Sequence, residues 1–355
     1  MAAFLAYESA LAVLRSHAAT SGMPLRHARV FRLPDTSREV SSSLGGCPPE
    51  ATFSGRLHVL VSSPQSRSKR ASCTSHVWSQ PLVTGSFVNL GDDVYVSTPE
   101  FLFLQMASTS SLPQLVMLGY ELCGTYTLTD RYGRGFITDI VPITTPSKIS
   151  QYLARSPGRK GVDKAKAALR WIRAHSNSPM ETALAMLLTL PRQDGGQHLS
   201  PIVLNPEFPL NLEWRRRLGR QSFKPDIYFP KQRIAVEYYG KEDHTSISSK
   251  QYDATRQALM EYLGIRVLGV TSEELYHPDK YIGMLKELYR LLGKKYRMPS
   301  DDQQVSTLLL KDEILPGHDS TRYLHSINRK HRSTPCISPK PRVARKTAGD
   351  EKTES

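Results

Sequence analysis

The order of apolar and polar residues predicts an α+β region in the first part of the chain, up to about residue 143. Short runs of alternating apolar and polar residues there are typical of strands, and apolar residues at helical spacing are typical of helices. The expected elements are strands at 57–62, 76–79 and 94–97 and helices at 98–107 and 112–122. The region is long enough to bury a core of its own.

A polar segment, residues 144–177, separates this region from the next. It contains the helix breakers Pro146, Pro157 and Gly158. A helix is then predicted that carries several basic residues, namely Lys164, Lys166, Arg170 and Arg173. We expect a boundary between two domains here, with residues 1–143 forming the smaller, α+β domain.

Residues 178–293 show a succession of helix and strand signals that predicts an α/β domain. One helix, at 250–263, ends before Gly264, which suits the position after a helix, and a buried strand is expected at 265–270. From residue 311 to 355, prolines and charged residues outnumber apolar ones. This last segment is predicted to be a disordered basic tail that adds nonspecific attraction to nucleic acid.

The net charge of the chain favours a polyanionic partner. Its 355 residues include 47 Lys and Arg against 33 Asp and Glu, which gives a formal net charge of +14. Cationic surface gains free energy by displacing counterions from phosphates. Nucleic acid is therefore the expected partner, ahead of an anionic membrane surface.

Several features predict a soluble protein of the cytoplasm. No run reaches the roughly 20 apolar residues that span a bilayer. The N-terminal stretch lacks a basic start and contains Glu8, which predicts a short amphipathic helix and no signal peptide. The cysteines lack the spacing of a zinc site or a disulfide framework, so we expect reduced thiols; they are Cys47, Cys73, Cys123 and Cys336.

Three acidic residues in the second region are candidates for a functional site. The first, Glu181, lies three residues after Ser178, where the sequence Ser-Pro-Met-Glu predicts the start of a helix that runs to about residue 190. A capping role would by itself explain this glutamate, because Ser-x-x-Glu is common at helix starts. Its assignment to a site therefore depends on the other two acids.

The other two acids lie in a predicted hairpin. Two strand-like runs, 225–229 and 233–239, flank a turn centred just after Lys231. In that register Asp226 lies directly opposite Glu237, with the two Cβ atoms about 5 Å apart. Like charges in this position destabilise a sheet unless a bound cation, a basic partner or a raised pKa compensates.

Magnesium is a cation that suits this pair. Mg²⁺ takes oxygen ligands, keeps several waters, and is often held by one or two carboxylates together with substrate phosphates. We therefore expect Asp226 and Glu237 to bind it, with Glu181 as a third or outer ligand. Strand alternation places Tyr239 on the same face as Glu237. The opposite face is predicted to be buried, and it carries Ile234, Val236 and Tyr238.

Over residues 178–275 these motifs resemble the PD-(D/E)XK nucleases, specifically the branch similar to very-short-patch-repair endonucleases. Glu181 matches the acid of the first core helix, Pro225-Asp226 the PD, and Glu237 the second acid. The resemblance implies a restriction-endonuclease-like mixed sheet flanked by helices. It also implies a magnesium-dependent endonuclease, with manganese as a substitute, that hydrolyses DNA phosphodiester bonds in phage defence or DNA repair.

The chain departs from this family two positions after the second acid. The family has lysine, aspartate or another polar residue there, and this chain has Tyr239. A lysine would orient the attacking water and offset charge in the transition state, which a phenol matches only in part. Lys241 or Lys224 would have to substitute for it. An aromatic ring packed at a strand end is an equal alternative for Tyr239.

The resemblance also singles out residues after the hairpin. His244 matches a histidine common in this branch and would protonate the leaving oxygen or bind phosphate; a solvated loop histidine is the alternative. In the next helix, Asp253 and Arg256 occupy positions that are usually polar in the family. Surface charge would also explain these two residues.

A cluster of arginines just before the hairpin is a candidate nucleic-acid contact. Guanidinium groups match phosphate oxygens in two-point geometry, and Trp214 adds an aromatic ring. A charged edge strand or loop is the alternative. The residues predicted to contact nucleic acid are Arg215, Arg216, Arg217, Arg220 and Arg256.

The first domain resembles the C-terminal part of abortive-infection-type antitoxins, through an order of short motifs that includes HVLV, HVWSQPL and LGYELCGTY. This resemblance implies a module that binds a protein partner and positions the nuclease domain. The alternative function of the chain is a catalytically weakened nucleic-acid-binding regulator, or an antitoxin-like protein, on a nuclease scaffold. Retention of all three acids favours the enzyme, because carboxylates beside a phosphate backbone weaken binding.

Overall fold

The computed structural model describes residues 2–20, 27–28, 30, 33, 55–67, 72–130, 133–240, 247–321 and 323, with 27 and 247–254 described by their backbone alone. The chain divides into two compact units, Met1–His318 and Asp319–Ser355, and the elements below belong to the first. None of the helices in these ranges is long and apolar enough to cross a membrane. Cys47, Cys336 and most of the predicted tail lie outside the described residues.

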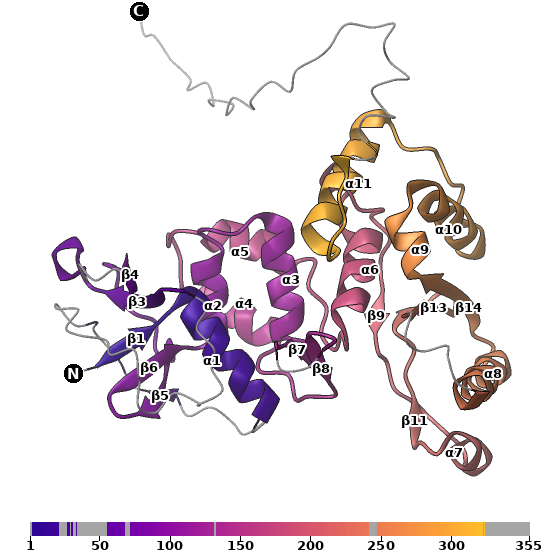
Figure 1. The fold of residues 1–355 in the computed structure, drawn as a ribbon, viewed down its shortest axis with the longest axis horizontal. Coiled ribbons are helices and arrows are strands. Elements are labelled where there is room, and N and C mark those ends of the chain that lie inside the picture. Colours follow the sequence, from indigo (N-terminus) through magenta and orange to yellow (C-terminus); the bar gives the residue numbers. More distant parts are fainter. Residues whose placement is uncertain are drawn as a thin grey trace, which may run out of the picture. The chain divides into compact units, whose positions relative to one another are not determined.

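The structure belongs to the α/β class, as predicted. Its N-terminal part contains a six-stranded mixed sheet with the strand order β2-β5-β6-β1-β3-β4 (Figure 1). The strands are β1 (Ala3–Leu5), β2 (His27–Ala28), β3 (Leu57–Val61), β4 (Cys73–Val77), β5 (Phe87–Gly91) and β6 (Val94–Ser97). The helices of this part are α1 (Tyr7–Thr20), α2 (Pro99–Met106) and α3 (Leu112–Leu122), and a short hairpin follows, β7 (Tyr126–Leu128) and β8 (Phe136–Thr138).

The N-terminal residues form a strand before they form a helix, which differs from the prediction of a single amphipathic helix. Strand β1 pairs in parallel with β6 and antiparallel with β3. Its three residues are all buried, because a strand inside a sheet is covered on both faces. Helix α1 begins only at Tyr7, whose positive φ of 47° turns the chain out of the sheet.

The segment predicted as a linker followed by a basic helix contains two helices. It forms α4 (Pro146–Ala154) and α5 (Val162–Leu169). Thr145 caps α4 by accepting a hydrogen bond from the Lys148 N–H, and Pro146 occupies a first-turn position that suits proline. This proline therefore starts a helix. Both helices contribute apolar side chains to the main hydrophobic core.

The predicted hairpin lies in a second, four-stranded sheet with the order β14-β13-β12-β9. Its strands are β9 (Val203–Leu204), β12 (Ile227–Phe229), β13 (Ile234–Tyr239) and β14 (Arg266–Thr271). Strand β13 runs antiparallel to β12 and parallel to β14. A parallel pair needs a crossover connection, and α8 provides it. The surrounding elements are α6 (Pro179–Thr189), β10 (Phe208–Pro209), α7 (Leu212–Leu218), β11 (Ser222–Phe223), α8 (Ile247–Tyr262), α9 (Ser272–Tyr276) and α10 (Pro278–Leu291).

Helices cover both faces of this second sheet. Ile234 and Val236 pack in one hydrophobic cluster with side chains of α6 and α10, which confirms that this face is buried. Tyr228 and Ala235, on the other face, pack in a separate cluster with side chains of α7 and α8. Figure 1 shows these helices around β13 and β14. The acids of the hairpin therefore lie at the edge of a covered face.

Helix α11 (Asp301–Ile314) is an element that the sequence analysis did not predict. Ser300 begins it with a capping box that includes Gln303. The helix continues past residue 311, where the disordered tail was expected to start, and Leu310 and Ile314 are buried. The apolar side of this helix is short, which explains why the pattern of residues did not reveal it.

Lys311 on this helix is a buried cation. Its residue surface is only 1% exposed, and its Nζ lies 3.8 Å from the centre of the Tyr281 ring. Burial lowers the pKa of Lys311 to about 7. A cation–π contact offsets part of the cost of removing the charge from water.

We expect Lys311→Met to stabilise the protein, because methionine keeps an apolar contact with the ring and removes a buried charge. The unfolded chain holds this proton up to its ordinary pKa of 10.5, whereas the folded protein releases it at about 7. The cost is therefore complete below the folded pKa and declines as the pH rises towards the unfolded one. The gain in unfolding free energy should be larger at about pH 6 than at about pH 9, and reach up to about 4 kcal/mol.

Urea unfolding at both pH values measures this gain. Lys286→Met, at an exposed position of α10, is the matched control and should change little. A Lys311→Met protein less stable than the wild type at the lower pH would contradict the account.

Candidate functional site

The hairpin has the register that the sequence predicts. Ile227 pairs with Val236, and Phe229 pairs with Ile234. The same register continued by one residue brings Asp226, just before β12, opposite Glu237 in β13. Asp226 is fixed there because its Oδ2 accepts a hydrogen bond from the Tyr238 N–H at 2.8 Å. The Glu237 side chain is only 1% exposed, and that of Asp226 is 16% exposed.

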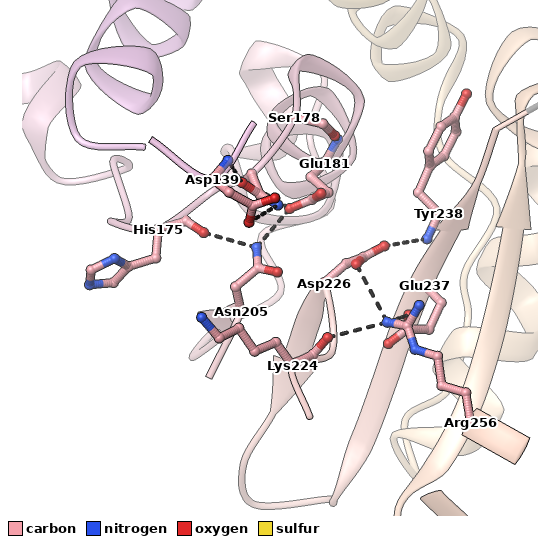
Figure 2. A network of polar contacts seen from close by, with 11 residues as sticks. Asp139, His175, Ser178, Glu181, Asn205, Lys224, Asp226, Glu237, Tyr238 and Arg256 are labelled. Carbon is pink, nitrogen blue, oxygen red and sulfur yellow. Dashed lines mark hydrogen bonds and ion pairs between the residues drawn. The ribbon is translucent and has the colours of Figure 1, made fainter. Parts of the chain in front are cut away.

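Glu181 lies at the start of α6 and has the predicted capping neighbour. The Ser178 hydroxyl accepts a hydrogen bond from the Glu181 N–H at 3.1 Å. The Glu181 carboxylate does not close a capping box, because its Oε2 accepts from the Asn177 N–H at 2.9 Å and from the Asn205 side chain at 2.7 Å. The residue is buried. Ser178 therefore caps the helix, and the Glu181 carboxylate is left to face the other acids (Figure 2).

Asn205 connects these acids and was not predicted as a site residue. Its backbone N–H donates to the Asp226 carbonyl at 3.1 Å, and its Nδ2 donates both to Glu181 and to the His175 carbonyl at 2.8 Å. Its φ is 45°, a left-handed conformation that asparagine adopts more readily than most residues. That preference is the only signal in the sequence, and it does not by itself identify a site.

Burial and like charge raise the pKa of two acids. For Glu181, burial is the largest cause and the negative charge of Asp226 adds to it, while hydrogen bonds from Asn177 and Asn205 act in the opposite direction. For Glu237, burial again comes first and Asp226 second, and the positive charge of Arg256 opposes them. Both carboxyl groups therefore hold a proton more tightly than an ordinary glutamate.

Arg256 points into this group of acids. Its Nη2 forms an ion pair with Glu237 Oε2 and lies 3.9 Å from Asp226 Oδ1 (Figure 2). The same nitrogen donates to the Lys224 carbonyl at 3.2 Å, and the guanidinium lies 5.2 Å from the centre of the Phe223 ring. The interpretation of Arg256 as a surface charge is therefore wrong. Arg256 was also predicted to contact phosphate, and in this structure its guanidinium contacts carboxylates instead.

Tyr239 packs on the neighbouring strand. A Cβ added at Gly269 of β14 would lie 2.5 Å from Cε2 of the Tyr239 ring, so the ring occupies the space above this glycine. Gly269 is the β14 residue that pairs with Glu237. The structure thus supports the alternative interpretation of Tyr239, an aromatic ring packed at a strand end. The ring lies over the β14 residue that pairs with Glu237.

Of the two lysines considered as substitutes, Lys224 does not direct its ammonium group to the acids. The Lys224 ammonium forms an ion pair with Glu207 at 2.7 Å. Lys241 and His244 lie outside the described residues, as does the side chain of Asp253. Their predicted roles remain predictions.

Three of the four arginines lie on helix α7, so an edge strand or loop is wrong for them, whereas Arg220 lies in the short loop after the helix. Asn211 caps the helix by accepting from the Trp214 N–H, and Gly219 ends it in a left-handed conformation. Arg217 pairs with Glu213 and lies over the Trp214 ring. All four arginines are exposed to solvent; they are Arg215, Arg216, Arg217 and Arg220.

Asp226 and Glu237 have the chemistry to hold a magnesium ion. Both residues offer oxygen ligands. The backbone N–H of Asp226 also lowers the pKa of Glu237, which favours the charged form that a metal binds. Neither oxygen of the buried Glu237 carboxylate makes a hydrogen bond of normal geometry with any described residue. Within the described ranges, no three His, Cys, Asp or Glu side chains are arranged to hold a metal. Mg²⁺ commonly takes one or two protein carboxylates together with water and phosphate, and the pair meets that number.

Comparison of the chain with models of protein families, with characterised proteins and with solved structures finds no match.

Glu181→Gln tests the electrostatics of the site. Glutamine keeps an acceptor oxygen for Asn177 and Asn205 and removes the charge. Because the folded pKa of Glu181 lies above its ordinary value of 4.5, ionising it costs stability, and the cost grows as the pH rises through that interval. We expect little change in unfolding temperature at about pH 5 and an increase of a few degrees at about pH 9.

Calorimetry at both pH values gives the answer. Glu261→Gln, at an exposed position of α8, is the control and should shift neither value. An unfolding temperature of Glu181→Gln below that of the wild type at the higher pH would refute this electrostatic account.

Proposed function

We propose that the chain is a magnesium-dependent endonuclease that hydrolyses DNA phosphodiester bonds on a restriction-endonuclease-like fold, and that it acts in the cytoplasm. The observation that carries the proposal is the register of the hairpin, which sets Asp226 opposite the buried Glu237. A fold gains no stability from two carboxylates in this position. Their placement is therefore best explained by a ligand that needs them.

The described residues divide the chemistry between them. Magnesium bound at Asp226 and Glu237 would polarise the scissile phosphate and lower the pKa of an attacking water. Manganese, which prefers similar ligands, would substitute. Glu181, whose pKa is raised, is suited to accept a proton from that water. Asn205 holds Glu181 and the Asp226 backbone in a fixed relation, as a positioning residue.

The α7 arginines supply the expected contact with the phosphate backbone. Arg215 and Arg217 also have structural partners, since Arg215 donates to the Leu210 carbonyl and Arg217 pairs with Glu213. No hydrogen bond or ion pair joins Arg216 to the part of the chain that is described. Arg216 is thus the member of the cluster whose charge is most available to a phosphate.

A catalytically weakened nucleic-acid-binding regulator is the second candidate. Two observations favour it: Arg256 already neutralises Glu237, and Tyr239 fills the space over Gly269 where the resemblance would place a catalytic polar group. The N-terminal region would then serve as the module that binds a protein partner. Retention of Glu181, Asp226 and Glu237 leads us to prefer the enzyme.

Cleavage of supercoiled plasmid with Mg²⁺ or Mn²⁺ tests the proposal. We expect metal-dependent nicking by the wild type, and a loss of about a hundredfold or more in Asp226→Asn and in Glu237→Gln, because each change removes a charged ligand from the metal. Circular dichroism should show that both variants are folded.

Glu207→Gln is the matched control for this assay, because Glu207 is an exposed glutamate that pairs only with Lys224 among the described residues. It should cleave like the wild type. DNA binding without cleavage by the wild type would favour the regulator, and full cleavage by Asp226→Asn would disprove the site.

Arg216→Gln should weaken binding to a DNA duplex by a few-fold, uniformly across sequences, and lower the salt dependence of the binding constant by about one counterion. Binding isotherms at several salt concentrations measure both effects. Arg290→Gln removes the same charge from an exposed position of α10 and should leave the slope unchanged. Equal slopes for Arg216→Gln and the wild type would exclude α7 from the interface.

A further inference from the structure

Arg256 occupies the position at which a cation would meet the paired acids. One of its nitrogens, Nη2, contacts Glu237 Oε2, lies 3.9 Å from Asp226 Oδ1 and donates to the Lys224 carbonyl at 3.2 Å. The guanidinium also lies against the Phe223 ring, 5.2 Å from its centre. Its side chain is 22% exposed, so the charge lies between the buried acids and solvent.

The contacts of Arg256 come from three different elements. Glu237 belongs to β13, Phe223 to β11, and Lys224 to the segment between β11 and β12, while Arg256 itself extends from α8. A side chain with this many partners has one preferred position. Charge-assisted hydrogen bonds to carboxylates are among the stronger polar contacts in proteins. Arg256 therefore competes directly with any other cation for Glu237.

We propose that Arg256 is an internal cation that locks the acid pair, and that a divalent metal enters only when this arginine leaves Glu237. The inference rests on the proposed metal-dependent function and adds to it a regulatory step at the same site. The two cations cannot both bind Glu237 Oε2 at contact distance. Metal affinity of the intact protein is therefore reduced by the strength of the Arg256 contact.

The lock explains how the fold tolerates its acids before metal binds. Without Arg256, two buried or half-buried carboxylates would face each other at the end of the hairpin with no cation. With it, Glu237 has a charged partner at Oε2, although neither of its carboxylate oxygens makes a hydrogen bond of normal geometry with a described residue. An arginine is suited to this task because its guanidinium stays charged at every physiological pH.

The affinity for Mn²⁺, measured on the full chain by isothermal titration calorimetry without nucleic acid, tests the lock. Arg256→Gln should bind Mn²⁺ at least about tenfold more tightly than the wild type, since a charge-assisted contact no longer competes. Arg256→Lys keeps a charge near the acids and should stay close to the wild type. Arg256→Met, which keeps an apolar stem against Phe223, repeats the test should the glutamine variant not fold.

The controls separate this inference from the proposed function. Arg290→Gln removes a positive charge from another exposed site and should leave Mn²⁺ affinity unchanged. Equal affinity in wild type, Arg256→Gln and Arg256→Met would overturn the lock and leave the metal site standing. No Mn²⁺ binding by any variant would overturn both. Binding that persists in an Asp226→Asn, Glu237→Gln double variant would place the metal elsewhere and overturn the lock.

Discussion

The opposition of Asp226 and Glu237 across one hairpin is the constraint on which the C-terminal half of the structure depends. Burying carboxylates costs free energy unless they gain partners. Here the partners come from the fold itself: the Tyr238 N–H holds Asp226, and Arg256 holds Glu237. The sheet places Glu237 at this point, the crossover helix α8 places Arg256 there, and the first turn of α6 places Glu181 there. Loss of the Tyr238 N–H or of Arg256 would leave a carboxylate at this point without its partner.

The network joins distant parts of the sequence through a few polar atoms. Asn205 links the start of α6 to Asp226, just before β12, and its Nδ2 also donates to the His175 carbonyl. Arg256 links α8 to the same spot from the opposite side of the hairpin. Because both faces of the sheet are packed with apolar side chains, the acids have little freedom to move apart. Such rigidity suits a site that binds a small hard cation.

Some of this arrangement was predictable from the sequence, and some was not. The hairpin register followed from the spacing of two strand-like runs around a turn, and the start of α6 followed from Ser178 and Pro179, because both depend on local rules. The contact of Arg256 with Glu237 and the place of Asn205 depend on how helices and loops close in three dimensions. The sequence pattern did not predict helix α7, because the helix buries only two apolar residues, Trp214 and Leu218, and its other positions are mostly charged.

We propose above that the acid pair is a site for a divalent cation. A crystal of the protein soaked in Mn²⁺, with data collected for anomalous scattering, tests it most directly. We expect a single strong peak at bonding distance from carboxylate oxygens of Asp226 and Glu237, with the Arg256 guanidinium displaced from Glu237. A fully soaked crystal with no peak there, and with Arg256 still on Glu237, would contradict it and leave the nucleic-acid-binding regulator as the better account.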